Sequence, residues 1–124
     1  MKNKILDIIE EHEQTVRFFK ENSIEIVSQI SDMVRKTFDQ EGRIFLCGNG
    51  GSMADCQHIA GEFVGKYRKV RQPLPAIAFS TDAALTTCIG NDFSYEAIFS
   101  RQMEALLNPG YMPWAFATRV SSSH

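Results

Sequence analysis

Two groups of residues in the middle of the chain have the types and the spacing of a chemical site. Gly48-Asn49-Gly50-Gly51-Ser52 follows a short apolar run, and His58 and Glu62 come soon after it. If the glycines form the turn between a strand and a helix, backbone N–H groups and the helix N-terminus can hold an anion. A tight turn without a ligand is also compatible, because the order of residues matches neither the Walker A nor the dinucleotide signature.

His58 and Glu62 are four residues apart, so a helix places both side chains on one face. An imidazole and a carboxylate placed in this way can ligate a metal ion, for which zinc is the natural candidate. The carboxylate can instead move a proton at a carbon next to a carbonyl. The two residues alone favour a plain surface pair, and two ligands do not complete a zinc site.

Two other polar stretches have less specific patterns. Asn91-Asp92 is expected in a loop, where it can contact sugar hydroxyls, although capping of the next helix is the default interpretation. A basic run follows the helix of His58 and is formed by Lys66, Arg68, Lys69 and Arg71. Cations at a helix end complement its dipole, and this is the preferred interpretation, with a contact from Arg68 to a phosphate left open.

Composition restricts the class of protein. The 124 residues suffice for one domain, and 44% hydrophobic with 23% charged residues is typical of a globular chain. A net charge of −2 argues against nucleic-acid binding. Three cysteines without C-x-x-C spacing indicate reduced thiols, and no apolar run has the length of a membrane span or a signal peptide. We therefore expect a soluble, cytoplasmic protein.

The elements that must position these residues can be read from hydrophobic periodicity. Helices are predicted over 2–21, from Ser23 to 38, and over 53–67, 83–89 and 94–107, with short apolar strands at 43–47 and 76–79. Strands that alternate with helices predict an α/β fold with a parallel, doubly wound sheet. The two N-terminal helices exceed what a small sheet needs, so the first is expected to pack on another subunit.

Four motifs together resemble one family, the sedoheptulose-7-phosphate isomerases (phosphoheptose isomerases) of the sugar isomerase (SIS) domain family. They are CGNGGS, HIAGEFVGKYR, LPAIAFSTD and CIGNDFSYEAIFSRQMEAL, and the resemblance covers about residues 40–110. It implies an SIS-type three-layer α/β/α fold with a parallel sheet, a homotetramer, and a zinc-supported site between subunits. The implied reaction converts sedoheptulose 7-phosphate to D-glycero-D-manno-heptose 7-phosphate, a bacterial precursor of surface polysaccharide such as lipopolysaccharide.

The resemblance also implies roles for individual residues. Asn49, Gly50, Gly51 and Ser52 would form the turn that binds the phosphorylated sugar, and Asn91 and Asp92 would form a second substrate loop. His58 and Glu62 would bind zinc, and Glu62 would also contact substrate as the catalytic proton carrier.

The chain departs from the family pattern after Asn108-Pro109-Gly110. The family continues with a strand, a serine/threonine loop that holds the phosphate, and a later helix that supplies a glutamine and a histidine. Here Pro113 argues against a central strand, whereas a coding sequence read two bases later resembles the missing strand. The resulting hypothesis is a shifted reading frame near residue 110.

The chain is then expected to divide into N-terminal helices at 1–41, the N-terminal part of an SIS domain at 42–110 and a tail at 111–124. It would lack the remaining zinc ligands and would turn over substrate poorly. Two alternatives to the isomerase are a non-catalytic SIS module that binds protein, such as the replication-initiator-associating paralogue, and a domain that senses sugar phosphates. Glu62 favours the enzyme, because a binding module has no need of it.

Overall fold

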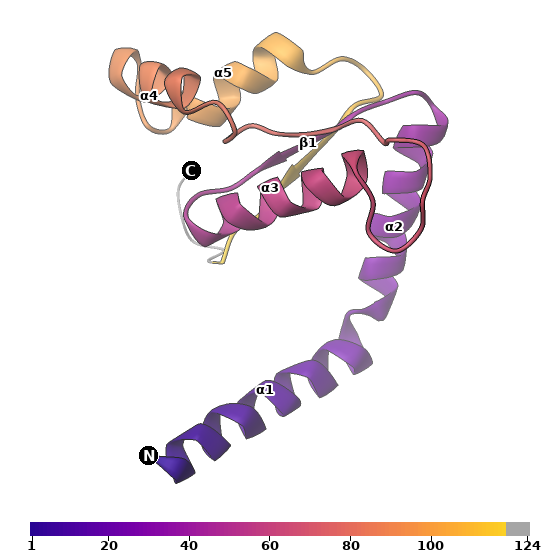
Figure 1. Ribbon diagram of the computed structural model, residues 1–124, viewed down its shortest axis with the longest axis vertical. Coiled ribbons are helices and arrows are strands. Elements are labelled where there is room, and N and C mark those ends of the chain that lie inside the picture. The colour runs from indigo at the N-terminus through magenta and orange to yellow at the C-terminus, as the bar shows by residue number, and fades with distance from the viewer. Residues whose placement is uncertain (119–124) are drawn as a thin grey trace. The chain divides into compact units, whose positions relative to one another are not determined.

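The computed structural model describes residues 1–118, and the chain divides into two compact units between Arg35 and Lys36. In chain order the elements are α1 (Lys2–Asn22), α2 (Ile24–Asp39), β1 (Ile44–Cys47), α3 (Gly51–Val64), β2 (Ala76–Ala78), α4 (Ala83–Asp92), α5 (Ala97–Leu106) and β3 (Met112–Ala115). The second unit holds the three strands and the helices that follow them (Figure 1). This arrangement confirms the predicted α/β class.

The central strand, β1, organises the second unit. It pairs in parallel with β2 on one side and β3 on the other, which gives the strand order β2-β1-β3. Ile44, Phe45 and Leu46 are at most 1% exposed, as expected for a strand covered on both faces of a parallel sheet. Full burial of such a side chain contributes about 1.5–3 kcal/mol to stability. The continuous apolar run therefore identified this strand correctly.

Helices cover both faces of the sheet, so the predicted three layers are present (Figure 1). On one face a cluster of Phe45, Cys47 and Phe79 packs against apolar side chains of α5 and the segment after it, Phe99, Met103, Leu107 and Tyr111. The rings of Phe45 and Phe79 stack with their centroids 5.1 Å apart. The other face is covered by α3, which buries Cys56 and Ala60.

The segment after Gly110 forms a strand, so the expectation that the family's strand is missing after this point is wrong. The N–H groups of Met112 and Phe116 donate to carbonyls of β1 and its flank, Arg43 O at 2.9 Å and Cys47 O at 2.8 Å. Because the donors alternate along a strand, the nitrogen of Pro113 faces away from β1, where it has no bond to make. In the described part of the chain β3 is an edge strand, which is where proline is tolerated.

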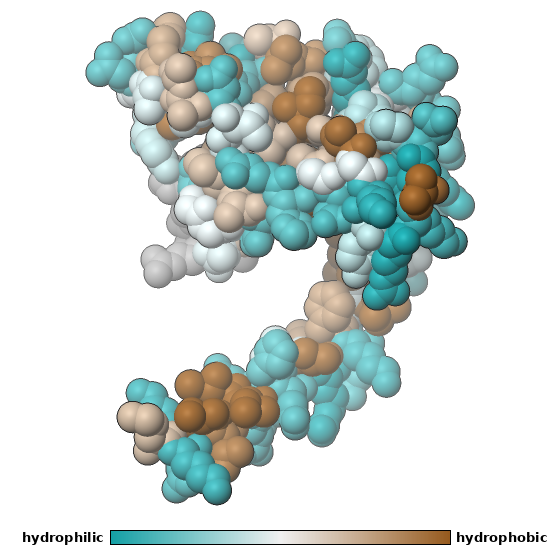
Figure 2. Space-filling model, viewed as in Figure 1, coloured by the Kyte–Doolittle hydropathy of each residue, from teal (hydrophilic) through white to brown (hydrophobic). Residues whose placement is uncertain are grey.

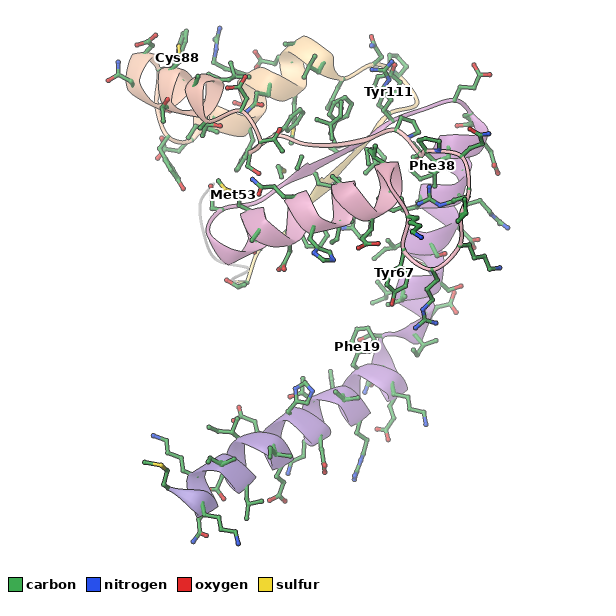
Figure 3. The ribbon with its side chains drawn as sticks, in the orientation of Figure 1. Phe19, Phe38, Met53, Tyr67, Cys88 and Tyr111 are labelled. Atoms are coloured by element: carbon green, nitrogen blue, oxygen red, sulfur yellow. The ribbon has the colours of Figure 1, made fainter. Side chains whose placement is uncertain are left out.

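Two helix boundaries differ from those expected. Helix α4 continues to Asp92, so Gly90, Asn91 and Asp92 form its last turn and not a loop. A glycine inside a helix costs about 1 kcal/mol relative to alanine, which weakens a helix without ending it. Helix α3 ends at Val64, and Tyr67 lies in the loop that follows (Figure 3). The polar residues Ser80-Thr81-Asp82 before α4 predict a helix cap, and Asp82 provides it, because its side chain accepts from Leu85 N–H at 2.9 Å.

The first unit consists of α1 and most of α2. No residue of α1 is buried, and large apolar side chains along it are about half exposed: Ile5, Leu6, Ile8, Ile9, Val16, Phe18 and Phe19. Figure 2 shows apolar side chains gathered on this helix. Among the helices of residues 1–118, none has the length and apolar character that crossing a membrane requires.

Gly42 provides a test of how closely the start of β1 is packed. Its N–H donates to Thr37 O at 2.8 Å, and an added Cβ would overlap the carbonyl oxygens of Thr37 and Gly110. We expect Gly42→Ala to lower the free energy of unfolding by about 1–3 kcal/mol, as overpacking does. Urea denaturation measures this change.

The matched control is Gly61→Ala in α3, where nothing lies within 4 Å of the added Cβ. This variant should raise the free energy of unfolding by roughly 0.5–1 kcal/mol, because alanine favours the helix. Equal effects of the two substitutions would contradict the close approach at Gly42.

Candidate functional site

A cleft of about 840 Å³ opens at the carboxyl ends of β1 and β3. Its lining begins with the ends of these two strands, Cys47 and Ala115, and continues through Gly48, Asn49, Ser52, Tyr95, Glu96, Phe99, Ser100, Met103, Phe116, Ala117 and Thr118. The chain adds β2 on one side of β1 and then β3 on the other, so the strand order reverses between β1 and β3. Ligands of open α/β sheets bind at such switch points.

The glycine turn forms one wall of the cleft. Gly50 has φ 58° and ψ −124°, a conformation open in practice only to glycine, and its carbonyl accepts from Met53 N–H at 3.1 Å as α3 begins. Asn49 and Ser52 line the cleft, so the turn brings two of the predicted substrate residues together. Gly50 and Gly51 lie between these two residues and form the start of α3. The N-terminus of a helix favours a bound anion.

His58 and Glu62 face each other on α3, as their spacing predicts. Nε2 of His58 lies 3.4 Å from Oε1 of Glu62, and the two side chains are 75% and 35% exposed. The other carboxylate oxygen, Oε2, is buried and has no hydrogen-bond partner among the described residues. A buried acceptor left in this state costs free energy, so it has capacity for a proton or a cation. This property goes beyond a plain surface pair.

The His58–Glu62 pair and the cleft occupy different parts of α3. From Ser52 to Glu62 the helix rises about 15 Å, at 1.5 Å for each residue. Neither His58 nor Glu62 is among the residues that line the cleft. The predicted metal pair and the predicted anion turn thus share one helix without meeting within the part of the chain that the structure describes.

A complete metal site is not formed by residues 1–118, because no group of three or more His, Cys, Asp or Glu side chains gathers there. His58 and Glu62 fit part of a zinc site, since they offer an imidazole nitrogen and carboxylate oxygens on one face. Burial raises the pKa of the Cys47 thiol, and burial is also the main cause that raises the pKa of Cys56 to about 11. Both thiols therefore stay protonated and act as apolar groups.

Asn91 and Asp92 lie in the last turn of α4, and neither lines the cleft. Their default interpretation as a cap for the next helix is wrong, because Ser94 Oγ accepts from Ala97 N–H there at 3.3 Å. Asp92 instead accepts from Asn91 Nδ2 at 2.8 Å and from Cys88 Sγ at 3.3 Å. These two bonds, led by that from Asn91, lower the pKa of Asp92.

Within the basic run, Arg71 confirms the preferred interpretation of a cation at a helix end. Its guanidinium donates to the carbonyls of Glu62 and Phe63 in the last turn of α3. Arg68 lies over the ring of Tyr67 at 5.2 Å and does not line the cleft. Ser121, Ser122 and Ser123, which follow the cleft-lining Thr118 in sequence, lie outside the described residues.

Sequence reasoning missed that α5 and the two residues before it line the cleft. Tyr95, Glu96, Phe99 and Ser100 were assigned only to a helix, although all four line the cleft. Their spacing places Tyr95, Phe99 and Met103 on one face, which the apolar pattern alone would assign to the core. The only sequence signal was the polar residue that follows Tyr95 and the one that follows Phe99 (Glu96 and Ser100). This signal becomes informative only when the helix is known to cross the end of β1.

Comparison with known families matches most of the chain. The model of the SIS domain family matches residues 8–111. The phosphoheptose isomerase of Roseiflexus sp. (strain RS-1) is 45% identical over 114 residues, which are 92% of this chain and 58% of that protein. The phosphoheptose isomerase of Aquifex aeolicus (strain VF5) is 38% identical over 124 residues, 100% of this chain and 65% of that protein.

Solved structures agree with these relatives. The structure of phosphoheptose isomerase GmhA from Neisseria gonorrhoeae superposes with a TM-score of 0.89 at 30% identity, over 98% of this chain and 62% of that chain. The chain thus spans between 58% and 65% of the length of these three proteins. The roles of single residues in substrate and zinc binding stay predictions, as does the shifted reading frame.

Cys88 provides a test of the contact to Asp92. Its hydrogen bond to Asp92 and the negative charge of that carboxylate raise the pKa of the Cys88 thiol. The thiolate is the reactive form, so removing the charge should lower the pKa and speed alkylation. We expect Asp92→Asn to increase the rate of Cys88 alkylation by iodoacetamide at pH 8 several-fold, measured by peptide mass spectrometry.

Cys47 and Cys56 are the internal controls, because both are buried and should remain unmodified in the folded protein. An unchanged rate at Cys88 would mean that the contact with Asp92 is not formed in solution.

Proposed function

Because the chain belongs to the SIS domain family, we propose that it provides the N-terminal part of a phosphoheptose isomerase. The reaction is the conversion of sedoheptulose 7-phosphate to D-glycero-D-manno-heptose 7-phosphate. The names of the relatives support an isomerase over a protein-binding or sugar-phosphate-sensing SIS module. The observation that carries the proposal is the glycine turn, which brings Asn49 and Ser52 into the cleft at the carboxyl ends of β1 and β3.

The chemistry requires a group that carries a proton between neighbouring carbons. A base removes a proton from C1 of the ketose, the carbonyl oxygen at C2 becomes a hydroxyl, and an ene-diol forms. Return of a proton to C2, with loss of the proton from the oxygen at C1, gives the aldose. Glu62 is the proposed carrier, because its Oε2 is buried and has no hydrogen-bond partner among the described residues.

The glycine turn would hold the polar part of the substrate. Backbone N–H groups at Gly50 and Gly51 precede the first turn of α3, where the helix dipole favours negative charge. Asn49 adds an amide and Ser52 a hydroxyl at the cleft. Asn91 and Asp92, the second proposed substrate segment, are exposed at the end of α4, and the two hydrogen bonds to Asp92 keep its carboxylate ready to accept from sugar hydroxyls.

Zinc is part of the proposal. His58 and Glu62 would supply two of its ligands, through the imidazole nitrogen and the carboxylate that already face each other. The remaining ligands are expected from residues other than those described, since a zinc site needs three or four. When bound, the ion would polarise the carbonyl oxygen of the substrate as a Lewis acid.

The proposal places the protein in the cytoplasm, in the synthesis of heptose precursors for surface polysaccharide. Cys47, Cys56 and Cys88 are free, which supports a reducing compartment. The proposed assembly is a homotetramer. Its support is α1, whose half-exposed apolar side chains would be covered by α1 of another copy (Figure 2).

The catalytic part of the proposal is tested with a chimera. Residues 1–110 of this chain are joined to the corresponding C-terminal part of the Roseiflexus relative, and turnover of sedoheptulose 7-phosphate is measured with zinc present. We expect the chimera to be active and its Glu62→Gln variant to lose about 10²–10⁴-fold in kcat, the usual contribution of an acid/base group.

The matched control is Glu104→Gln, an exposed carboxylate of α5 outside the cleft, which should keep full activity. The 124-residue chain is assayed in parallel and should turn over substrate poorly. Near-normal turnover by the Glu62→Gln chimera would refute the role of Glu62.

The oligomeric part is tested by sedimentation velocity on the 124-residue chain. We expect a mass above that of a monomer, and Ile9→Glu should shift the distribution toward the monomer because a charge replaces a half-exposed apolar side chain. Glu10→Gln, a change on the neighbouring residue, should leave the mass unchanged. A monomeric parent chain at micromolar concentration would contradict α1 as a subunit contact.

A further inference from the structure

Arg71 joins the loop after α3 to the last turn of that helix. Its Nη1 donates to Phe63 O at 2.8 Å and to Gln72 O at 2.9 Å, and its Nη2 donates to Glu62 O at 2.9 Å. The carbonyls at a helix C-terminus have no partner within the helix, so a planar guanidinium that reaches two of them satisfies an otherwise open end. Leu74 N–H adds a further bond to Phe63 O at 3.0 Å.

The same turn is held on its other side by aromatic packing. The ring of Phe63 meets that of Phe38 edge to face, with the centroids 5.5 Å apart. Figure 3 shows Phe38 beside the C-terminal end of α3. Phe63 is thus fixed through both its ring and its carbonyl, and the residue before it is Glu62.

The Glu62 carboxylate has little else to hold it. Oε1 of Glu62 lies 3.4 Å from Nε2 of His58, whose side chain is itself 75% exposed. Oε2 has no hydrogen-bond partner among the described residues. The position of the carboxylate therefore depends on the backbone of the last helical turn. Helix ends fray when their carbonyls are not satisfied, and the bond from Arg71 reaches the carbonyl of Glu62 itself.

We propose that Arg71 is a positioning residue for Glu62, which it fixes through the carbonyls of Glu62 and Phe63. The importance of this for catalysis rests on the proposed function, where Glu62 carries the proton. Lysine cannot replace the arginine, because an ammonium lacks the planar fork that reaches two carbonyls at once. Asn49 and Ser52 lie at the opposite end of α3, so substrate recognition in the cleft does not depend on Arg71.

The test uses Arg71→Lys in the 124-residue chain, with Lys69→Ala as the matched control from the same basic run. The order of the Glu62 side chain is measured by NMR three-bond couplings, and amide exchange is measured at Leu74. We expect Arg71→Lys to average the Glu62 rotamers and to speed exchange at Leu74 roughly tenfold, as loss of a charge-assisted hydrogen bond would. Lys69→Ala should change neither.

Chemical rescue separates positioning from a general loss of stability. In Arg71→Ala, added guanidinium ion at millimolar concentration should restore a single Glu62 rotamer, whereas an equal concentration of sodium chloride should not. Guanidinium ion is itself a mild denaturant, so it would not restore the order of the Glu62 side chain in a variant that is merely less stable. Failure of rescue together with an ordered Glu62 in Arg71→Lys would overturn the proposal.

Titration with sedoheptulose 7-phosphate distinguishes failure of this inference from failure of the proposed function. Shifts at the amides of Asn49 and Ser52 should be the same in the parent chain and in Arg71→Lys. If the parent binds the sugar phosphate but Glu62 stays ordered in Arg71→Lys, the inference fails and the function stands. If the parent shows no binding, the proposed function fails, and with it the catalytic meaning of Arg71.

Discussion

The second unit depends on the burial of β1 between two layers of helices. Ile44, Phe45 and Leu46 leave no exposed face, so both neighbouring strands and both helical layers are positioned against this one strand. In a parallel sheet the chain passes from the carboxyl end of a strand into a connecting helix, and here three residues, Gly48, Asn49 and Gly50, join β1 to α3. The cleft forms where it does because this turn and the end of β3 meet at the same edge of the sheet.

Features encoded in neighbouring residues were predictable from the sequence. The apolar run of β1, the glycine turn into α3 and the cap at Asp82 each depend on contacts within a few residues, and the structure contains all three. The strand that contains Pro113 was missed because the effect of a proline depends on which side of the strand its nitrogen faces, which only the pairing with β1 determines. Asn91 and Asp92 were misplaced because a glycine next to a potential cap was given more weight than the continuing helix.

Long-range features could not be read from the sequence for a related reason. That α5 lines the cleft follows from how its first turns cross the carboxyl end of β1, and no periodic pattern records such a crossing. The contact from Arg71 to Glu62 joins residues nine positions apart in the sequence, across the end of α3, and the sequence showed only four cations after a helix. The cluster of cations predicted that one of them would contact the carbonyls at the end of α3. Which one does so, Arg71 and not Arg68, depends on the path of the loop and could not be predicted.

The geometry of α3 keeps the two groups of predicted site residues apart. The helix carries the predicted anion turn at its N-terminus and the His58–Glu62 pair near its other end, about 15 Å further along its axis. A substrate held at the turn reaches Glu62 only if it lies along the helix. A metal ion bound by His58 and Glu62 requires further ligands, which must approach the face of α3 that carries these two side chains. Among residues 1–118 no third His, Cys, Asp or Glu side chain gathers with this pair to supply them. A zinc site at this pair would have to be completed by other residues. Oε2 of Glu62, which has no hydrogen-bond partner among the described residues, marks where they would have to approach.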